Sequence, residues 1–95
     1  MRASPEALPQ DVREDVRRMR EALRTAARQS GLSYWRIEEA LGMCGGYLNV
    51  IFAGKVELRV AHVFGILRAI GAEPRRFFLE LRAAEERRGS GHDAA

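Results

Sequence analysis

The sequence predicts a single all-α domain built from five helices. Apolar residues recur at spacings of three and four, which places them along one face of a helix. Glycine or proline stands at the helix boundaries, and no segment alternates as a half-buried strand does. The 95 residues, of which 46% are hydrophobic, can bury one core. We therefore divide the chain into a flexible leader (1–10), a helical domain (11–88) and a disordered tail (89–95).

The first expected helix covers 11–29 and ends at Gly31, because glycine adopts the left-handed closing conformation at low cost. Its apolar stripe consists of Val12, Val16, Met19, Leu23 and Ala26. This spacing also suits a seam between two helices, so the stripe can bind a second copy of the chain. Within one subunit, we expect its first three residues to pack on the fifth helix, against Phe78 and Leu81.

The second expected helix covers 34–41 and the third covers 45–53, with Gly42 at the turn between them. Ser33 can cap the second helix through its hydroxyl group. The inward face of the third helix is formed by Leu48, Ile51 and Phe52. No charged residue occurs between positions 43 and 54, so the outward face of the third helix offers few groups to a polar partner.

The fourth expected helix covers 58–70, and the fifth begins at Pro74, a residue favoured in the first helical turn. The stripe of the fourth helix is Val60, Val63, Phe64, Leu67 and Ile70. The stripe of the fifth is Phe77, Phe78, Leu81 and Ala84. Both stripes are expected to complete the core, whereas the sequence GSGHDAA from Gly89 onward has the composition of a tail.

Residues 34–54 also have the arrangement of a two-helix DNA-binding motif. The positions that would lock its helices together are Ile37, Leu41, Met43, Leu48 and Ile51. Gly42 stands at the turn and Gly54 closes the third helix. This arrangement resembles the helix-turn-helix of the Cro/cI repressor-like family, also called the XRE family, over about residues 23–79. The resemblance implies a five-helix lambda-repressor-like domain, here with an extended first helix.

The resemblance further implies a function. In that family the third helix enters the major groove of double-stranded DNA, and paired subunits read two half-sites. We therefore expect a transcriptional regulator, a repressor in particular, that binds DNA as a homodimer with full or weak sequence specificity. No cofactor is expected. The net charge of +3 permits a polyanionic partner but does not require one.

The resemblance also assigns site residues. The positions expected to face the bases are Gly45, Gly46, Tyr47, Asn49 and Val50. The positions expected to contact the sugar-phosphate backbone are Tyr34, Trp35, Arg36, Lys55 and Arg59. An Asn side chain can bind adenine through two hydrogen bonds, and an apolar side chain can contact the methyl group of thymine. Glycines at a helix start let phosphate approach the backbone N–H groups. For Trp35, a buried packing role is the alternative.

Two features of the second helix depart from the family pattern. Tyr34 and Trp35 open the second helix where the family usually has Gln, which removes a familiar phosphate contact. Glu38 stands where the family usually has a small Ala that touches the third helix. We expect the Glu38 side chain either to bend outward or to push the two helices apart.

A second function is compatible with the same fold. The third helix could dock another protein through its apolar outward residues, as an adaptor, an antitoxin or a phage accessory protein does. The residues expected to form this surface are Tyr47, Val50, Phe52 and Ala53. Exposed apolar surface of this kind often marks a protein interface.

Catalytic functions are poorly supported by the sequence. A P-loop would need Gly at 49 and Ser or Thr at 56, where Asn49 and Val56 stand. Cys44 and His62 form the one nucleophile and base combination, and nothing brings them together. A single cysteine forms no intramolecular disulfide, and no apolar stretch approaches the length of a membrane span. We expect a soluble cytoplasmic protein that is not an enzyme and binds no metal.

Overall fold

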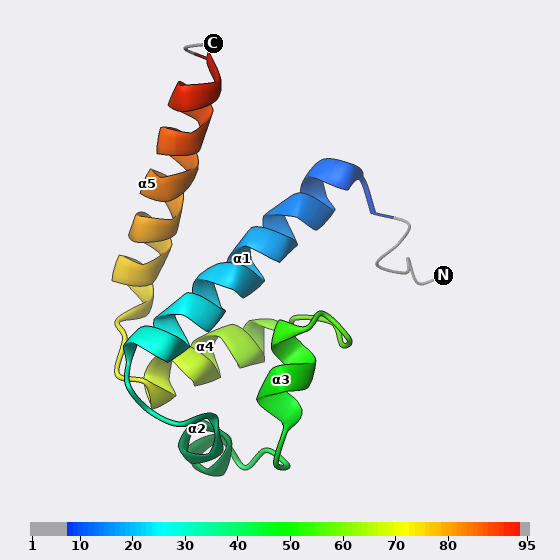
Figure 1. The fold of residues 1–95 in the computed structure, drawn as a ribbon, viewed down its shortest axis with the longest axis vertical. Helices are drawn as coiled ribbons and strands as arrows, with labels where there is room; N and C mark the ends of the chain where they lie inside the picture. Colours follow the sequence, from blue (N-terminus) through cyan, green and yellow to red (C-terminus); the bar gives the residue numbers. More distant parts are fainter. Residues whose placement is uncertain (1–7, 94–95) are drawn as a thin grey trace.

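The computed structural model describes residues 8–93, which form five helices in the order expected (Figure 1). The helices are α1 (Gln10–Gln29), α2 (Tyr34–Leu41), α3 (Tyr47–Phe52), α4 (Val60–Ala69) and α5 (Pro74–Asp93). No strand occurs within residues 8–93. The prediction of an all-helical chain is therefore confirmed, whereas most of the predicted leader lies outside the described residues.

The core lies where α4 passes between α1 and α2, with α3 closing one end (Figure 1). Six large side chains are fully buried there: Leu23, Ile37, Leu48, Ile51, Ile66 and Leu67. Each of α1, α2 and α3 contributes at least one of them, so the short helices α2 and α3 are stabilised by tertiary packing more than by their own length. In residues 8–93, no helix combines the length and apolar composition needed to span a membrane.

Helix α3 is shorter than expected, because it begins at Tyr47 and not at position 45. Gly46 has a φ of 89°, in the left-handed region that a right-handed helix excludes. Gly45 and Gly46 therefore form the approach to α3, and neither lies in its first turn. Helix α4 likewise begins later than expected, at Val60.

Helix α5 is longer than expected, because its backbone stays helical through Asp93. The helix therefore runs past the boundary expected at Gly89, while residues 94–95 lie outside the described part. A glycine costs a helix about 1 kcal/mol relative to alanine, which shortens a weak helix but does not necessarily end one that is already formed.

The apolar stripe of α1 does not pack on α5 as expected. Helices α1 and α5 meet near the core and then diverge (Figure 1). Val12 is 38% exposed, and Met19 packs against the buried core. The surface of α1 that lines the groove toward α5 includes Arg18 and Ala22 but none of Val12, Val16 and Met19.

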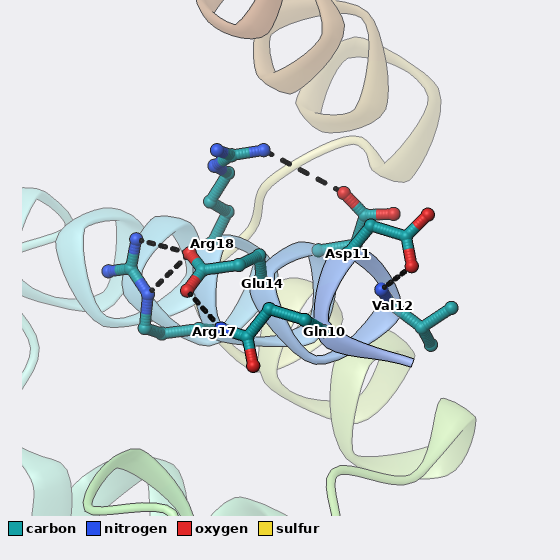
Figure 2. Close-up of polar contacts among 7 residues, drawn as sticks. Gln10, Asp11, Val12, Glu14, Arg17 and Arg18 are labelled. Carbon is teal, nitrogen blue, oxygen red and sulfur yellow. Dashed lines mark hydrogen bonds and ion pairs between the residues drawn. The ribbon is translucent and has the colours of Figure 1, made fainter. Parts of the chain in front are cut away.

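Local contacts stabilise the N-terminal half of α1, which projects from the core (Figures 1 and 2). The guanidinium group of Arg17 donates to a carboxylate oxygen of Glu14 at 3.1 Å. The carboxylate of Asp11 accepts the N–H of Val12 at 2.9 Å, at the end of the helix that favours negative charge. Exposed pairs of this kind each add only about 0.2–0.5 kcal/mol. These local pairs therefore add only a small part of the stability of this half of α1.

Candidate functional site

The turn between α2 and α3 depends on a left-handed glycine. Gly42 has a φ of 68°, and its N–H donates to the carbonyl oxygen of Glu39 at 3.2 Å. The N–H of Met43 donates to the carbonyl oxygen of Glu38 at 2.8 Å, and the Met43 side chain packs against the core. This geometry ends α2 and redirects the chain toward α3, as the sequence predicted from Gly42.

Glu38 joins α2 to α3 by a buried hydrogen bond. Its side chain is only 4% exposed, and Oε2 accepts the backbone N–H of Leu48 at 3.0 Å. The expectation that Glu38 bends outward or pushes the helices apart is therefore wrong. Gly46, which precedes α3, has no side chain to accept a first-turn N–H group. Glu38 supplies that acceptor from the neighbouring helix, and its negative charge suits a helix N-terminus.

A cation lies at the other end of α3. The guanidinium group of Arg20, on α1, lies beside Gly54, where a Cβ atom would come within 3.7 Å of it. Carbonyl groups at a helix C-terminus favour positive charge. Helix α3 is thus fixed at its start by a carboxylate from α2 and approached at its end by a guanidinium group from α1. The hydrogen bond from the Leu48 N–H to Glu38 holds the start of α3 against α2.

The residues expected to face DNA bases differ in exposure. Asn49 is exposed on α3, whereas Val50 is half-buried. Tyr47 is also half-buried, and its ring lies edge-on to the ring of His62 with the centroids 5.9 Å apart. Gly45 and Gly46 are exposed but precede the helix. The structure therefore leaves Asn49 as the exposed polar side chain of α3.

The residues expected to contact phosphates form two groups. Trp35 and Arg36 lie in the first turn of α2, where both are exposed, and Trp35 is 62% exposed. The buried role considered for Trp35 is therefore wrong. Lys55 and Arg59 are exposed in the segment that follows α3 (Figure 1). All four side chains are thus exposed, two on the first turn of α2 and two in the segment after α3.

Tyr34 does not belong with those exposed residues. Its ring is half-buried and lies 5.5 Å from the ring of Phe52, centroid to centroid. Phe52 itself is only 7% exposed. Phe52 therefore belongs to the core and not to the apolar outward surface that the alternative function assigned to it. The aromatic contact instead packs the start of α2 against the end of α3.

His62 connects the segment after α3 to the start of α4. Its Nδ1 atom accepts the backbone N–H of Arg59 at 3.2 Å, so Nδ1 must carry no proton and the ring is neutral. Burial lowers the pKa of His62 below its ordinary value of 6.5, and the nearby Arg59 guanidinium lowers it further. Sequence reasoning considered His62 only as a catalytic base. Its position three residues after Arg59 has the spacing of a reciprocal helix cap, which could have identified this role.

Stability should depend on the protonation of His62. The pKa of His62 is lower in the folded chain than in the unfolded chain. At pH values between these two pKa values, the unfolded chain therefore binds more protons. The stabilisation is therefore complete above pH 6.5 and is lost as the pH falls through the folded pKa. Urea denaturation across this range should show a shallower pH dependence for His62→Gln than for the unmodified protein. His92→Gln, at the second histidine, is the control; equal slopes for His62→Gln and the unmodified protein would contradict this role.

Among the side chains that the structure describes, in residues 8–88, no group of three or more His, Cys, Asp or Glu is arranged to hold a metal ion. Cys44 is exposed in the turn between α2 and α3. Comparisons with protein-family models, with curated proteins and with solved structures found no match to the chain. The function is therefore argued from the geometry of α2, α3 and the residues around them.

Proposed function

We propose that the protein binds double-stranded DNA through α3, as a helix-turn-helix regulator of transcription and specifically as a repressor that acts as a homodimer. The observation that carries this proposal is that α3 is anchored to α2 by a buried hydrogen bond. A six-residue helix is held at its N-terminus by Glu38 while Asn49 remains exposed on its outer side. A rigid short helix with an exposed polar residue is suited to entering the major groove.

The packing around the turn supports the resemblance to the Cro/cI repressor-like family. Three of the locking residues, Ile37, Leu48 and Ile51, are fully buried. Leu41 and Met43 are half-buried and pack against the same core. A fold in which these positions are buried leaves the opposite side of α3 as the surface available to a ligand.

The free energies available for base discrimination favour a weakly specific DNA binder. One Asn–adenine contact gives about 1–3 kcal/mol of discrimination, while specific binders separate target from bulk DNA by about 4–10 kcal/mol. Two copies of Asn49 in a dimer reach the lower part of that range. Arg36, Lys55 and Arg59 would supply sequence-independent affinity by neutralising phosphates, and Trp35 would lie against the sugar-phosphate backbone.

A protein-docking role for α3 has less support. Of the four apolar residues assigned to that surface, Phe52 is buried and Tyr47 packs on His62. Only Val50, half-buried, and Ala53, exposed, remain available. A surface of two small side chains is well below the size that marks a protein interface. We therefore propose DNA as the ligand of α3 and a binding role without a catalytic step.

Salt dependence tests the proposal directly. Fluorescence anisotropy with a labelled duplex should show affinity that falls linearly on a log–log plot as salt increases. Lys55→Ala should reduce the magnitude of that slope by about 1, which corresponds to one phosphate contact. Arg82→Ala is the matched control, because Arg82 is an exposed cation on α5 that pairs with Glu86. Absence of binding at low salt, or affinity independent of salt, would contradict the proposal.

A further inference from the structure

Helices α1 and α5 enclose a groove where they diverge from the core (Figure 1). Its volume is about 510 Å³. This volume lies in the range of about 300–1,000 Å³ that is typical of small-molecule sites. All the residues that line the groove belong to α1 or α5. The groove is therefore separate from the surface around α3 that we propose for DNA.

The inner end of the groove, next to the core, is apolar. Phe77 is buried there, and Ala26 and Leu81 pack against the same core. Ala22 and Ala84 extend the apolar lining outward along α1 and α5. Because the three alanines have small side chains, they leave space between the two helices. An apolar group that entered this space would be removed from water, which favours binding.

The outer end of the groove is basic. Arg17 and Arg18 line it from the projecting half of α1. Arg88 lines it from the outer half of α5 (Figure 1). A ligand that fits both ends of the groove therefore has an apolar body and an anionic group.

The two carboxylates that also line the groove do not cancel this charge. Glu80 pairs at 3.1 Å with Arg76, a residue that does not line the groove. Glu21 is exposed, so water and salt screen its charge. Arg17 is also paired, with Glu14 at 3.1 Å. The guanidinium groups of the other two lining arginines are therefore the ones to which an anion has access.

Arg18 is the better placed of these two. Its side chain extends from α1 on the side that faces α5 (Figure 2). It lies 3.8 Å from a carboxylate oxygen of Asp15, which is too long for a hydrogen bond. Its Nε atom is buried, and no described residue accepts the Nε–H. A carboxylate that binds the guanidinium group through two parallel hydrogen bonds would supply the missing acceptor.

The apolar and basic ends are a defined distance apart. Ala26 and Arg18 are eight residues apart on α1. At about 1.5 Å per residue this is about 12 Å, which suits an alkyl chain of about ten carbon atoms. We propose that the groove binds a small organic carboxylate with an unbranched apolar chain. The chain lies along the alanines with its end against Phe77, and the carboxylate binds Arg18.

Isothermal titration calorimetry of the full chain with sodium decanoate, without DNA, tests the proposal. We expect saturable binding at one site per chain. Octanoate should bind about tenfold more weakly, because it buries two fewer methylene groups and each contributes up to about fourfold in affinity. Decyltrimethylammonium has the same chain length and the opposite charge, so it should bind far more weakly than decanoate. Absence of saturable decanoate binding, or equal affinity for the two charges, would overturn the proposal.

Arg18→Ala should weaken decanoate binding by about tenfold, because it removes the charged donor of the carboxylate. Arg28→Ala is the matched control, since Arg28 is an exposed cation on α1 that does not line the groove. Its affinity for decanoate should stay within about twofold of the original, as expected for a distant screened charge. Equal affinities of the two variants would overturn the binding of the carboxylate at Arg18.

A substitution that fills the groove tests the position of the alkyl chain. Ala84→Phe should weaken decanoate binding by at least about tenfold, because the ring occupies the space of several methylene groups. Ala83→Phe is the control, since Ala83 is the neighbouring residue on α5 and does not line the groove. Circular dichroism of both variants checks that the helices are retained. Equal decanoate affinities of the two folded variants would overturn the proposal.

NMR titration of the unmodified chain locates the ligand without any substitution. Decanoate should shift the amide signals of Ala22 and Ala84 and the Nε–H signal of Arg18, while the amides of α3 stay unchanged. Shifts centred on another part of the chain would overturn the proposal. Sedimentation equilibrium identifies a competing occupant. Self-association that is lost in Ala84→Phe, in a chain that binds no decanoate, would assign the groove to a second copy and overturn the carboxylate site.

The carboxylate site does not depend on the proposed function. All these measurements are made without DNA, so their outcomes are separate from those of DNA binding. Decanoate binding by a chain that binds no duplex would leave the groove site standing and remove the DNA-binding function. Duplex binding by a chain that binds no decanoate would remove the groove site alone.

Discussion

Glu38→Ala is expected to lower the free energy of unfolding by about 2–4 kcal/mol. A hydrogen bond to a charged acceptor contributes roughly 1.5–3 kcal/mol, and the loss of buried methylene groups adds to that cost. Glu38→Gln retains an oxygen that can accept the Leu48 N–H, so it should lose no more than about half as much. Urea denaturation of the variants measures these differences.

Glu39→Ala is the matched control, because Glu39 is the exposed neighbour of Glu38 on α2. Its effect should stay within about 0.5 kcal/mol, as is usual for surface substitutions. Hydrogen exchange at the Leu48 amide gives a local readout, since loss of the acceptor should speed exchange there more than in α4. If Glu38→Ala unfolds at the same urea concentration as Glu39→Ala, Glu38 does not stabilise α3.

Leu48→Ala is expected to cost about 2–5 kcal/mol, the range measured when a buried leucine is truncated. Leu48 is fully buried, whereas the adjacent Asn49 is exposed. Asn49→Ala should therefore leave the unfolding free energy within about 0.5 kcal/mol of the original. Thermal or urea denaturation of both variants checks this contrast.

In DNA binding the substitution at the exposed position, Asn49→Ala, is the one expected to change the sequence preference. Asn49→Ala should relax sequence preference at one base pair while sparing non-specific affinity, which selection from a randomised duplex pool can measure. If Leu48→Ala were as stable to denaturation as Asn49→Ala, the assignment of Leu48 to the buried face of α3 would be wrong. An unchanged preference in Asn49→Ala would remove Asn49 from the reading surface.

The helices themselves could be predicted from the sequence. Periodicity identified the inward face of α3, where Leu48, Ile51 and Phe52 are all buried. Gly42 marked the turn because a left-handed residue is needed there, and its φ is 68°. These predictions succeeded because they depend on local geometry, which neighbouring residues determine.

The errors arose where a residue's partner lies elsewhere in the chain. Periodicity shows that Val12, Val16 and Met19 share a face of α1, but it does not show which helix covers that face. For Glu38, a charge at a position suited to a small side chain predicted a conflict. The structure instead pairs its carboxylate with the Leu48 N–H, a group that Gly46 leaves without a local acceptor. The missing acceptor, and not the charge, was the informative signal.

The central claim is that the exposed side of α3 is the DNA-binding surface. The most direct measurement is a ¹H–¹⁵N NMR titration of the full chain with duplex DNA at low salt. We predict that the largest shift changes occur at the Asn49 side-chain amide, the Trp35 indole N–H and the Lys55 backbone amide. Amides in the C-terminal half of α5 should change far less. Saturating DNA that leaves the α2 and α3 signals unchanged, or changes confined to α5, would contradict the claim.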